Sequence, residues 1–95
     1  MSDVFRALAD PTRRAVLDEL HSRDGQTLFE LLTRLVQRHG VTSSRQAVSQ
    51  HLDVLEQAGL VRRHKEGRYV FHHLDRGPLR EALGRWGFTD REGLP

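Results

Sequence analysis

The strongest constraint on the fold is an amphipathic pattern in the middle of the chain. From Thr27 to about His39, apolar residues recur every three or four positions, which is the repeat of an α-helix. The polar residues fill the opposite arc. Thr27 and Glu30 match the T-x-x-E capping box that starts a helix, and Gly40 suits the position just after its end. The apolar arc contains Leu28, Phe29, Leu31, Leu32, Leu35 and Val36.

Similar start and stop signals predict four further helices. We expect them over residues 3–9, from 11 to about 21, from 43 or 44 to 58, and from 78 to about 86. Asp10 is predicted as an N-cap followed by Pro11 at the first helical position. We also expect Arg14 and Asp18 to pair across one turn, and the acidic residues to lie at caps or on solvent-facing arcs.

A β-hairpin is predicted after the fourth helix. Residues 60–64 and 69–73 are short strand-like runs, and Gly67 lies in the turn between them. Four helices, a hairpin and a last helix form the winged helix-turn-helix arrangement. The predicted fold is therefore mainly α, with a three-helix core, a wing and terminal helices. Residues 1–86 are predicted to form this one domain, and residues 87–95 a loose C-terminal tail.

Composition excludes several classes of protein. The sequence has no cysteine, so disulfides, thiolate metal sites and a cysteine nucleophile are excluded. It has no apolar run near the ~18 residues that a transmembrane helix needs. Its first residues do not resemble a secretion signal, so we expect no membrane association and a cytoplasmic location.

The polar face of the fourth predicted helix suits DNA. Glutamine pairs with adenine, arginine with guanine and serine with either base, and the acidic Asp53 and Glu56 come only later. A recognition helix presents its N-terminal residues to the major groove. The candidate DNA-binding residues are Ser44, Arg45, Gln46, Ser49 and Gln50. The alternative is an ordinary solvated helix face.

The predicted hairpin is basic. Between residues 62 and 68 only Glu66 opposes a cluster formed by Arg62, Arg63, His64, Lys65 and Arg68. This composition is typical of a wing that lies along a DNA backbone. The alternative is charge that protects an exposed strand edge from pairing.

Three stretches resemble the ArsR family of winged-helix repressors. They are FRALADPTRRAVLDEL (residues 5–20), SRQAVSQHLDVLEQAGLV (44–61), and the run from Arg62 through EGR (66–68) to Leu74. The resemblance spans residues 4–86. It implies a homodimer on a partly palindromic operator, with repression relieved by a signal. By position, it places Ser44, Arg45, Gln46, Ser49 and Gln50 at the DNA, and Arg63, Lys65 and Arg68 in the wing.

The sequence departs from the family pattern in two respects. Residues 36–39 and 42–43 look inserted before the recognition helix, so the resemblance does not fix the angle between that helix and its predecessor. Leucine and threonine occupy the position at which metal-sensing members place cysteine. The last helix also lacks the histidine and carboxylate spacing of the family's zinc sensors.

The terminal helices carry apolar stripes that predict a dimer interface. These stripes could instead cover the monomer's own core, but a three-helix core with a wing already has covering residues. Aromatic residues such as Trp86 commonly anchor interfaces. The predicted interface residues are Val4, Phe5, Leu8, Leu79, Ala82, Leu83 and Trp86.

The sequence does not predict a metal site, a cofactor or a catalytic site. His72 and His73 are adjacent in a predicted strand, so their side chains point to opposite faces and do not share an ion. His51 is expected to be structural or to reach a phosphate. The partner is therefore predicted to be double-stranded DNA, and any small-molecule effector is unknown. The alternative function is a winged-helix module for protein–protein contact.

Overall fold

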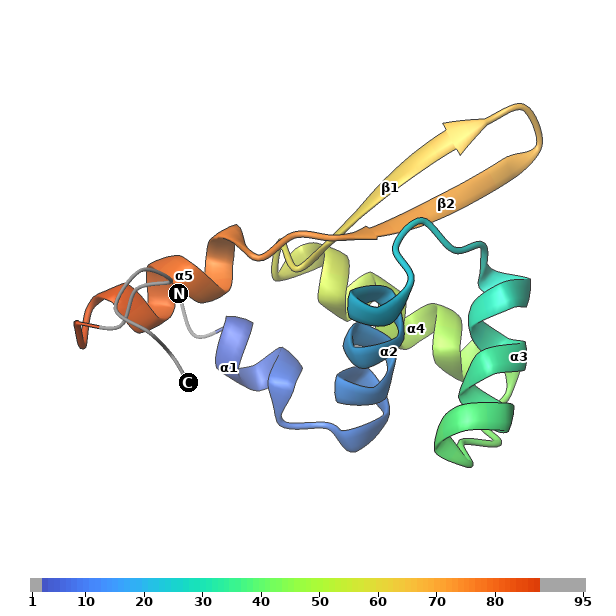
Figure 1. The fold of residues 1–95 in the computed structure, drawn as a ribbon, viewed down its shortest axis with the longest axis horizontal. Helices are drawn as coiled ribbons and strands as arrows, with labels where there is room; N and C mark the ends of the chain where they lie inside the picture. Colours follow the sequence, from blue (N-terminus) through green and yellow to red (C-terminus); the bar gives the residue numbers. More distant parts are fainter. Residues whose placement is uncertain (1–2, 88–95) are drawn as a thin grey trace.

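Five helices and one antiparallel hairpin follow one another along residues 3–87, the part of the chain that the computed structural model describes (Figure 1). The elements are α1 (Asp3–Leu8), α2 (Pro11–Ser22), α3 (Leu28–His39), α4 (Arg45–Gln57), β1 (Val61–Glu66), β2 (Tyr69–Leu74) and α5 (Gly77–Gly84). The predicted order is confirmed. Both strands are longer than predicted, and α5 ends two residues before Trp86. The predicted tail lies outside the described residues, apart from Gly87.

The helix ends form where the sequence supplies caps. Asp10 accepts a hydrogen bond from the Arg13 backbone N–H at 3.0 Å. The Thr27 hydroxyl accepts from the Glu30 N–H at 3.2 Å, and the Glu30 carboxylate accepts from the Thr27 N–H at 2.9 Å. These bonds satisfy N–H groups that have no partner within the helix. Gly40 ends α3 with φ at +64°, a left-handed conformation that suits glycine.

The core lies where α2, α3 and α4 meet the base of the hairpin. Its side chains come from the apolar arcs of the three helices and from the start of the wing. Val4 and Ala7 of α1 extend it. The central residues are Val16, Leu20, Leu31, Leu35, Val48, Leu52, Leu55, Leu60 and Val61.

Glu19 lies inside this core, contrary to the expectation that the acidic residues sit at caps or on solvent-facing arcs. Its exposed fraction is 1%, and two arginines and a histidine from α3 surround the carboxylate. The Arg34 side chain donates a hydrogen bond to it, the His39 Nε2 donates at 2.9 Å, and the Arg38 Nε lies 3.3 Å away. Burial raises the pKa of Glu19, but the hydrogen bonds from Arg34 and His39 outweigh burial and hold the pKa below its usual value. The carboxylate therefore joins α2 to α3 in its ionised form.

Arg14 also differs from the prediction. The Arg14 side chain donates to the carbonyl oxygen of Leu8 at 2.7 Å, and no ion pair joins it to Asp18 within residues 3–87. The Arg13 guanidinium donates to the carbonyls of Ala7 at 2.8 Å and Arg6 at 3.1 Å. The two arginines of α2 therefore cap the C-terminal end of α1.

The hairpin extends away from the helices as a wing (Figure 1). Its strands pair from Val61 opposite Leu74 to Glu66 opposite Tyr69. Gly67, with φ at +64°, begins the two-residue turn, as a type II′ turn requires. At the base, the Asp24 carboxylate accepts from the Leu74 N–H at 2.8 Å, and the His72 N–H donates to the Gln26 carbonyl at 2.8 Å. These bonds fasten β2 to the loop between α2 and α3.

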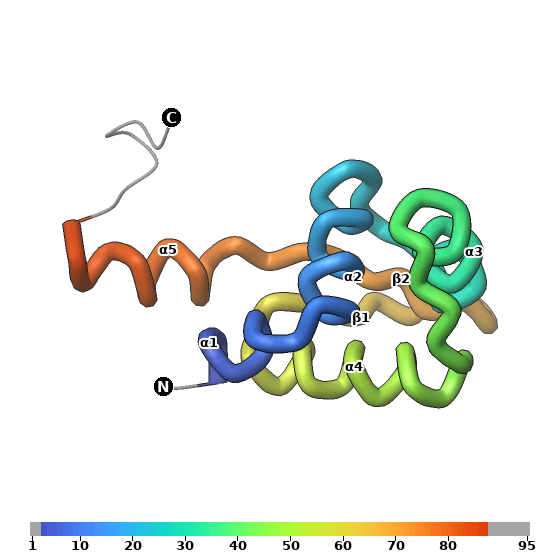
Figure 2. Tube along the Cα trace, turned by 90° about the horizontal axis from the view of Figure 1, so that it is seen from below, coloured from blue at the N-terminus to red at the C-terminus, as the bar shows by residue number. Residues whose placement is uncertain are grey.

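The fifth helix lies beside α1 and apart from the three core helices (Figure 2). None of its residues is fully buried, although Leu79 and Ala82 pack partly against the core. No helix within residues 3–87 combines the length and hydrophobicity that crossing a membrane requires.

Candidate nucleic-acid interface

The first two turns of α4 present polar side chains that the rest of the fold leaves free. The Ser44 hydroxyl caps the helix by accepting from the Ala47 N–H at 3.0 Å. Arg45, Gln46 and Gln50 are exposed and Ser49 is half-buried. Within residues 3–87, the side chains of these four make no hydrogen bond or ion pair. Their donors and acceptors are therefore available to a ligand.

These side chains form two stripes along α4. Arg45 and Ser49 line a cleft of about 580 Å³ between α4, the start of α3 and the wing. Gln46 and Gln50 do not line the cleft. Each follows its neighbour by one residue, which turns it about 100° around the helix axis. One stripe therefore faces the cleft, and the other lies to its side, outside the cleft.

The cleft is cationic. Its lining includes Arg45 from α4 and Arg63 and Arg68 from the wing, and it includes no aspartate or glutamate. Apolar surface comes from exposed Phe29, Tyr69 and Val70. The sequence reasoning missed these three residues, because exposed apolar side chains in a strand or at a helix start look like core positions.

The guanidinium of Arg63 is occupied within the chain. One nitrogen lies 2.9 Å from the Asp53 carboxylate, and the other lies 3.3 Å from that of Glu56. In the unbound chain Arg63 thus contacts α4, and its contact with the DNA backbone stays a prediction. Its charge is neutralised by α4, so Arg63 joins the wing to the recognition helix.

The other predicted wing residues lie further out. Lys65 is exposed, and alternation along β1 places it on the same face as Arg63. It has no ion-pair partner among residues 3–87. Arg68 lies at the turn, with its guanidinium carbon 5.9 Å from the centre of the Tyr69 ring.

The histidines form structural contacts. The His72 Nδ1–H donates to the Gln26 carbonyl at 2.8 Å, and burial lowers the pKa of His72. His73 donates to the Asp24 carboxylate at 2.9 Å. His51 is half-buried and accepts a hydrogen bond from Arg13 at 3.2 Å. Among residues 3–87, no three histidine or acidic side chains are grouped to hold a metal ion.

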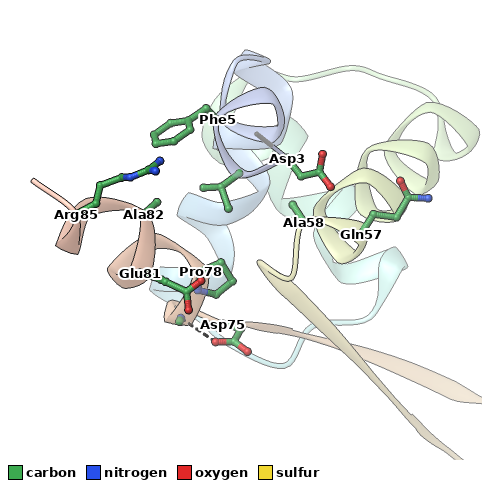
Figure 3. Close-up of a pocket in the computed structure, with 11 residues that line it drawn as sticks. Asp3, Phe5, Gln57, Ala58, Asp75, Pro78, Glu81, Ala82 and Arg85 are labelled. Carbon is green, nitrogen blue, oxygen red and sulfur yellow. Dashed lines mark hydrogen bonds between the residues drawn. The ribbon is translucent and has the colours of Figure 1, made fainter. Parts of the chain in front are cut away.

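A second cleft, of about 700 Å³, lies between α1, α5 and the C-terminal end of α4. Figure 3 shows Phe5 and Asp3 of α1 on one side, Ala82 and Glu81 of α5 on another, and Gln57 and Ala58 at the end of α4 on a third.

The predicted dimer residues fall into two groups that differ in exposure. Phe5 and Trp86 are 42% and 60% exposed, and their rings meet edge to face with centroids 6.0 Å apart. Val4, at 8%, belongs to the monomer's own core. Leu8, Leu79 and Ala82 pack partly against that core, and Leu83 is half-buried. The monomer therefore uses most of the predicted stripe itself and leaves its two aromatic residues exposed.

Comparisons with known proteins agree with this architecture. A family model described as a helix-turn-helix domain matches residues 8–64. YuzN of Bacillus subtilis, named as an HTH-type transcriptional regulator, is 43% identical over 83 residues, covering 87% of this chain and 90% of the relative. The transcriptional repressor SdpR of the same organism is 30% identical over 83 residues, covering 87% and 84%.

A solved structure has the same fold. The ArsR-like transcriptional regulator from Rhodococcus sp. RHA1 superposes with a TM-score of 0.73 at 36% identity, covering 90% of this chain and 77% of that one. Its fold, the matched helix-turn-helix model and the two relatives point to the same class of regulator, which is not a class of enzymes. The chain therefore belongs to the ArsR family of winged helix-turn-helix transcription regulators.

Proposed function

We propose that this regulator binds duplex DNA as a homodimer, at a partly palindromic operator, and represses transcription there. The observation that carries the proposal is the polar face at the start of α4, whose side chains have no partner within residues 3–87. A solvated helix face would also be exposed, but it would not need a basic wing and a cationic cleft beside it. The name of SdpR as a repressor supports the direction of regulation.

In this proposal Gln46 and Gln50 read bases. They share the stripe that lies outside the cleft. A glutamine amide can donate to and accept from the edge of an adenine. Ser44 offers backbone N–H groups at the helix start to a phosphate, which helix N-termini favour. Lys65 extends the contact along the wing.

Exposed aromatic residues in α1 and just after α5 support the proposed dimer. Phe5 and Trp86 present apolar surface that a second chain would cover, and aromatic residues often dominate such interfaces. A two-fold dimer would place two α4 helices in successive major grooves, about 34–36 Å apart. The two-fold symmetry of such a dimer is the reason to expect a partly palindromic operator.

Selection of bound sequences from a random DNA pool tests the proposal. A recovered inverted repeat is the expected result. On that duplex, Gln46→Ala and Gln50→Ala should each weaken binding by about 1–3 kcal/mol, with much smaller losses on a scrambled duplex. Gln37→Ala is the matched control, because Gln37 is an exposed glutamine on α3, away from the proposed site.

The competing function is a module for protein–protein contact whose basic face is incidental. That alternative predicts no enriched sequence, and equal binding of wild type and both glutamine variants to every duplex. Either result would rule out sequence-specific DNA recognition.

A further inference from the structure

We infer that the cleft between α4 and the wing seats the sugar–phosphate backbone of one DNA strand, so that Arg45 binds a phosphate and does not read a base. This inference rests on the proposed DNA binding. It changes the role of the first residue of the recognition helix, which the sequence grouped with the base-reading glutamines.

The charge of the cleft favours a polyanion. Arg45 and Arg68 line it from opposite elements, and neither pairs with a carboxylate within residues 3–87. Arg63 adds no free charge, because Asp53 and Glu56 hold its guanidinium. Burial lowers the pKa of His72, so this lining residue is neutral at physiological pH. Two unpaired cations therefore face a space without acidic groups.

The geometry of α4 separates phosphate contact from base contact. Arg45 and Ser49 are one turn apart and both line the cleft. Gln46 and Gln50 are also one turn apart, but they lie outside it. A duplex that offers base edges to the glutamine stripe would bring its backbone alongside the arginine stripe. Arg45 would then lie beside the sugar–phosphate backbone of the DNA and not over the bases.

The remaining walls suit the non-ionic part of a backbone. Phe29 at the start of α3 and Tyr69 in the wing are exposed and line the cleft. Their rings offer apolar surface to deoxyribose, while the Ser49 hydroxyl offers a hydrogen bond. The cleft, of about 580 Å³, is large enough to hold a short piece of the backbone of one strand.

Replacing arginine by lysine has different effects at a phosphate contact and at a base contact. A phosphate contact is mainly charge, so lysine retains it. A bidentate contact to guanine needs the planar guanidinium, so lysine weakens it at the specific sequence. The Arg45→Lys variant therefore separates the two roles, in addition to Arg45→Ala.

The experiment measures binding by fluorescence anisotropy across a salt series, on the selected duplex and on a scrambled duplex of the same composition. For Arg45→Ala we expect equal fold-losses on both duplexes and a salt slope lower by about 0.9 per bound chain. Raising the salt from 50 to 200 mM should therefore weaken the affinity of the variant about 3.5-fold less than that of wild type, per bound chain. Arg68→Ala should behave the same way, and Arg45→Lys should match wild type on both duplexes.

Arg76→Ala is the matched control. Arg76 is an exposed arginine before α5, outside α4, the wing and the cleft lining, and it donates to the His21 Nδ1 at 2.7 Å. Its removal should leave affinity and salt slope unchanged.

Two results would overturn the inference: an Arg45→Ala loss confined to the selected duplex, or an unchanged salt slope. If Gln46→Ala still loses its preference for the selected duplex in that experiment, the proposed function is supported and only the role assigned to Arg45 is wrong. If wild type binds neither duplex, the proposed function itself fails.

Discussion

Replacing Glu19 by glutamine should destabilise the fold strongly, although this residue is remote from the proposed DNA surface. The substitution keeps the size of the side chain and removes its charge. In the native fold the carboxylate is 1% exposed and accepts from Arg34 and His39, with Arg38 beside it. Glutamine would leave the two arginines without their anion and His39 without its carboxylate acceptor.

The magnitude depends on how well the cations recover water. Breaking a fully buried ion pair costs about 3–5 kcal/mol. Here the side chains of Arg34, Arg38 and His39 are 22%, 49% and 24% exposed, so each regains part of its hydration. The glutamine oxygen also keeps one acceptor. We therefore expect a loss of about 2–3 kcal/mol, a large share of the 5–15 kcal/mol that holds a domain folded.

Urea unfolding followed by far-ultraviolet circular dichroism measures this loss. Glu30→Gln is the matched control, since glutamine can replace glutamate in a capping box, and the Glu30 pair with Arg23 is long, at 3.8 Å, and exposed. The control should lose less than about 0.5 kcal/mol. An equally small loss for Glu19→Gln would refute the view that the buried carboxylate holds α2 to α3.

The pH dependence gives a second check on Glu19. Its pKa in the folded chain lies below the ordinary value of 4.5, so the unfolded chain takes up the proton first as the pH falls. The contribution of the ionised Glu19 to folding stability is complete above pH 4.5, and it is lost as the pH falls through the pKa that Glu19 has in the folded chain. The difference in stability between wild type and Glu19→Gln should therefore shrink in acid.

Three further predictions concern other parts of the fold. Burial lowers the pKa of neutral His72 below 6.5, so its contribution to folding stability is complete above pH 6.5 and is lost below it. His72→Asn keeps an N–H for the Gln26 carbonyl but does not titrate. In urea unfolding, this variant should therefore lose less stability than wild type between pH 7 and 5. Trp86→Ala should weaken the proposed dimer by about 2 kcal/mol or more in sedimentation equilibrium, whereas Val36→Ala on α3 should not. Gly40→Ala should cost about 1–2 kcal/mol in thermal unfolding because its φ is +64°, and Gly40→Asn should cost less.

The features that the sequence predicted well are those set by nearby residues. The caps at Asp10, Thr27 and Ser44 each need one side chain and an N–H three residues later, so the local sequence contains both partners. The apolar arcs of α3 and α4 likewise follow from helical periodicity alone. Their packing as a winged helix followed from the order of elements.

The features that the sequence did not predict depend on residues far apart in the chain. Arg63 looked like a free wing cation, because its partners Asp53 and Glu56 lie on a different element. Val4 looked like a residue of the dimer interface, because helical periodicity shows that a helix has an apolar face but does not show which surface covers that face. Glu19 looked solvated for the same reason, since its cationic partners lie 15 to 20 residues further along.

The residues that look inserted before the recognition helix have a structural use that their sequence does not reveal. Residues 36–39 form the last turn of α3, and this turn supplies Arg38 and His39 to the buried Glu19. Gly40 then ends the helix, and residues 40–44 lead to the cap of α4. The added turn thus enlarges the contact between α2 and α3, and Arg63 fixes α4 to the wing at the other side. Because the ion pairs of Arg63 with Asp53 and Glu56 lie within one chain, they hold the wing against α4 without any contribution from DNA.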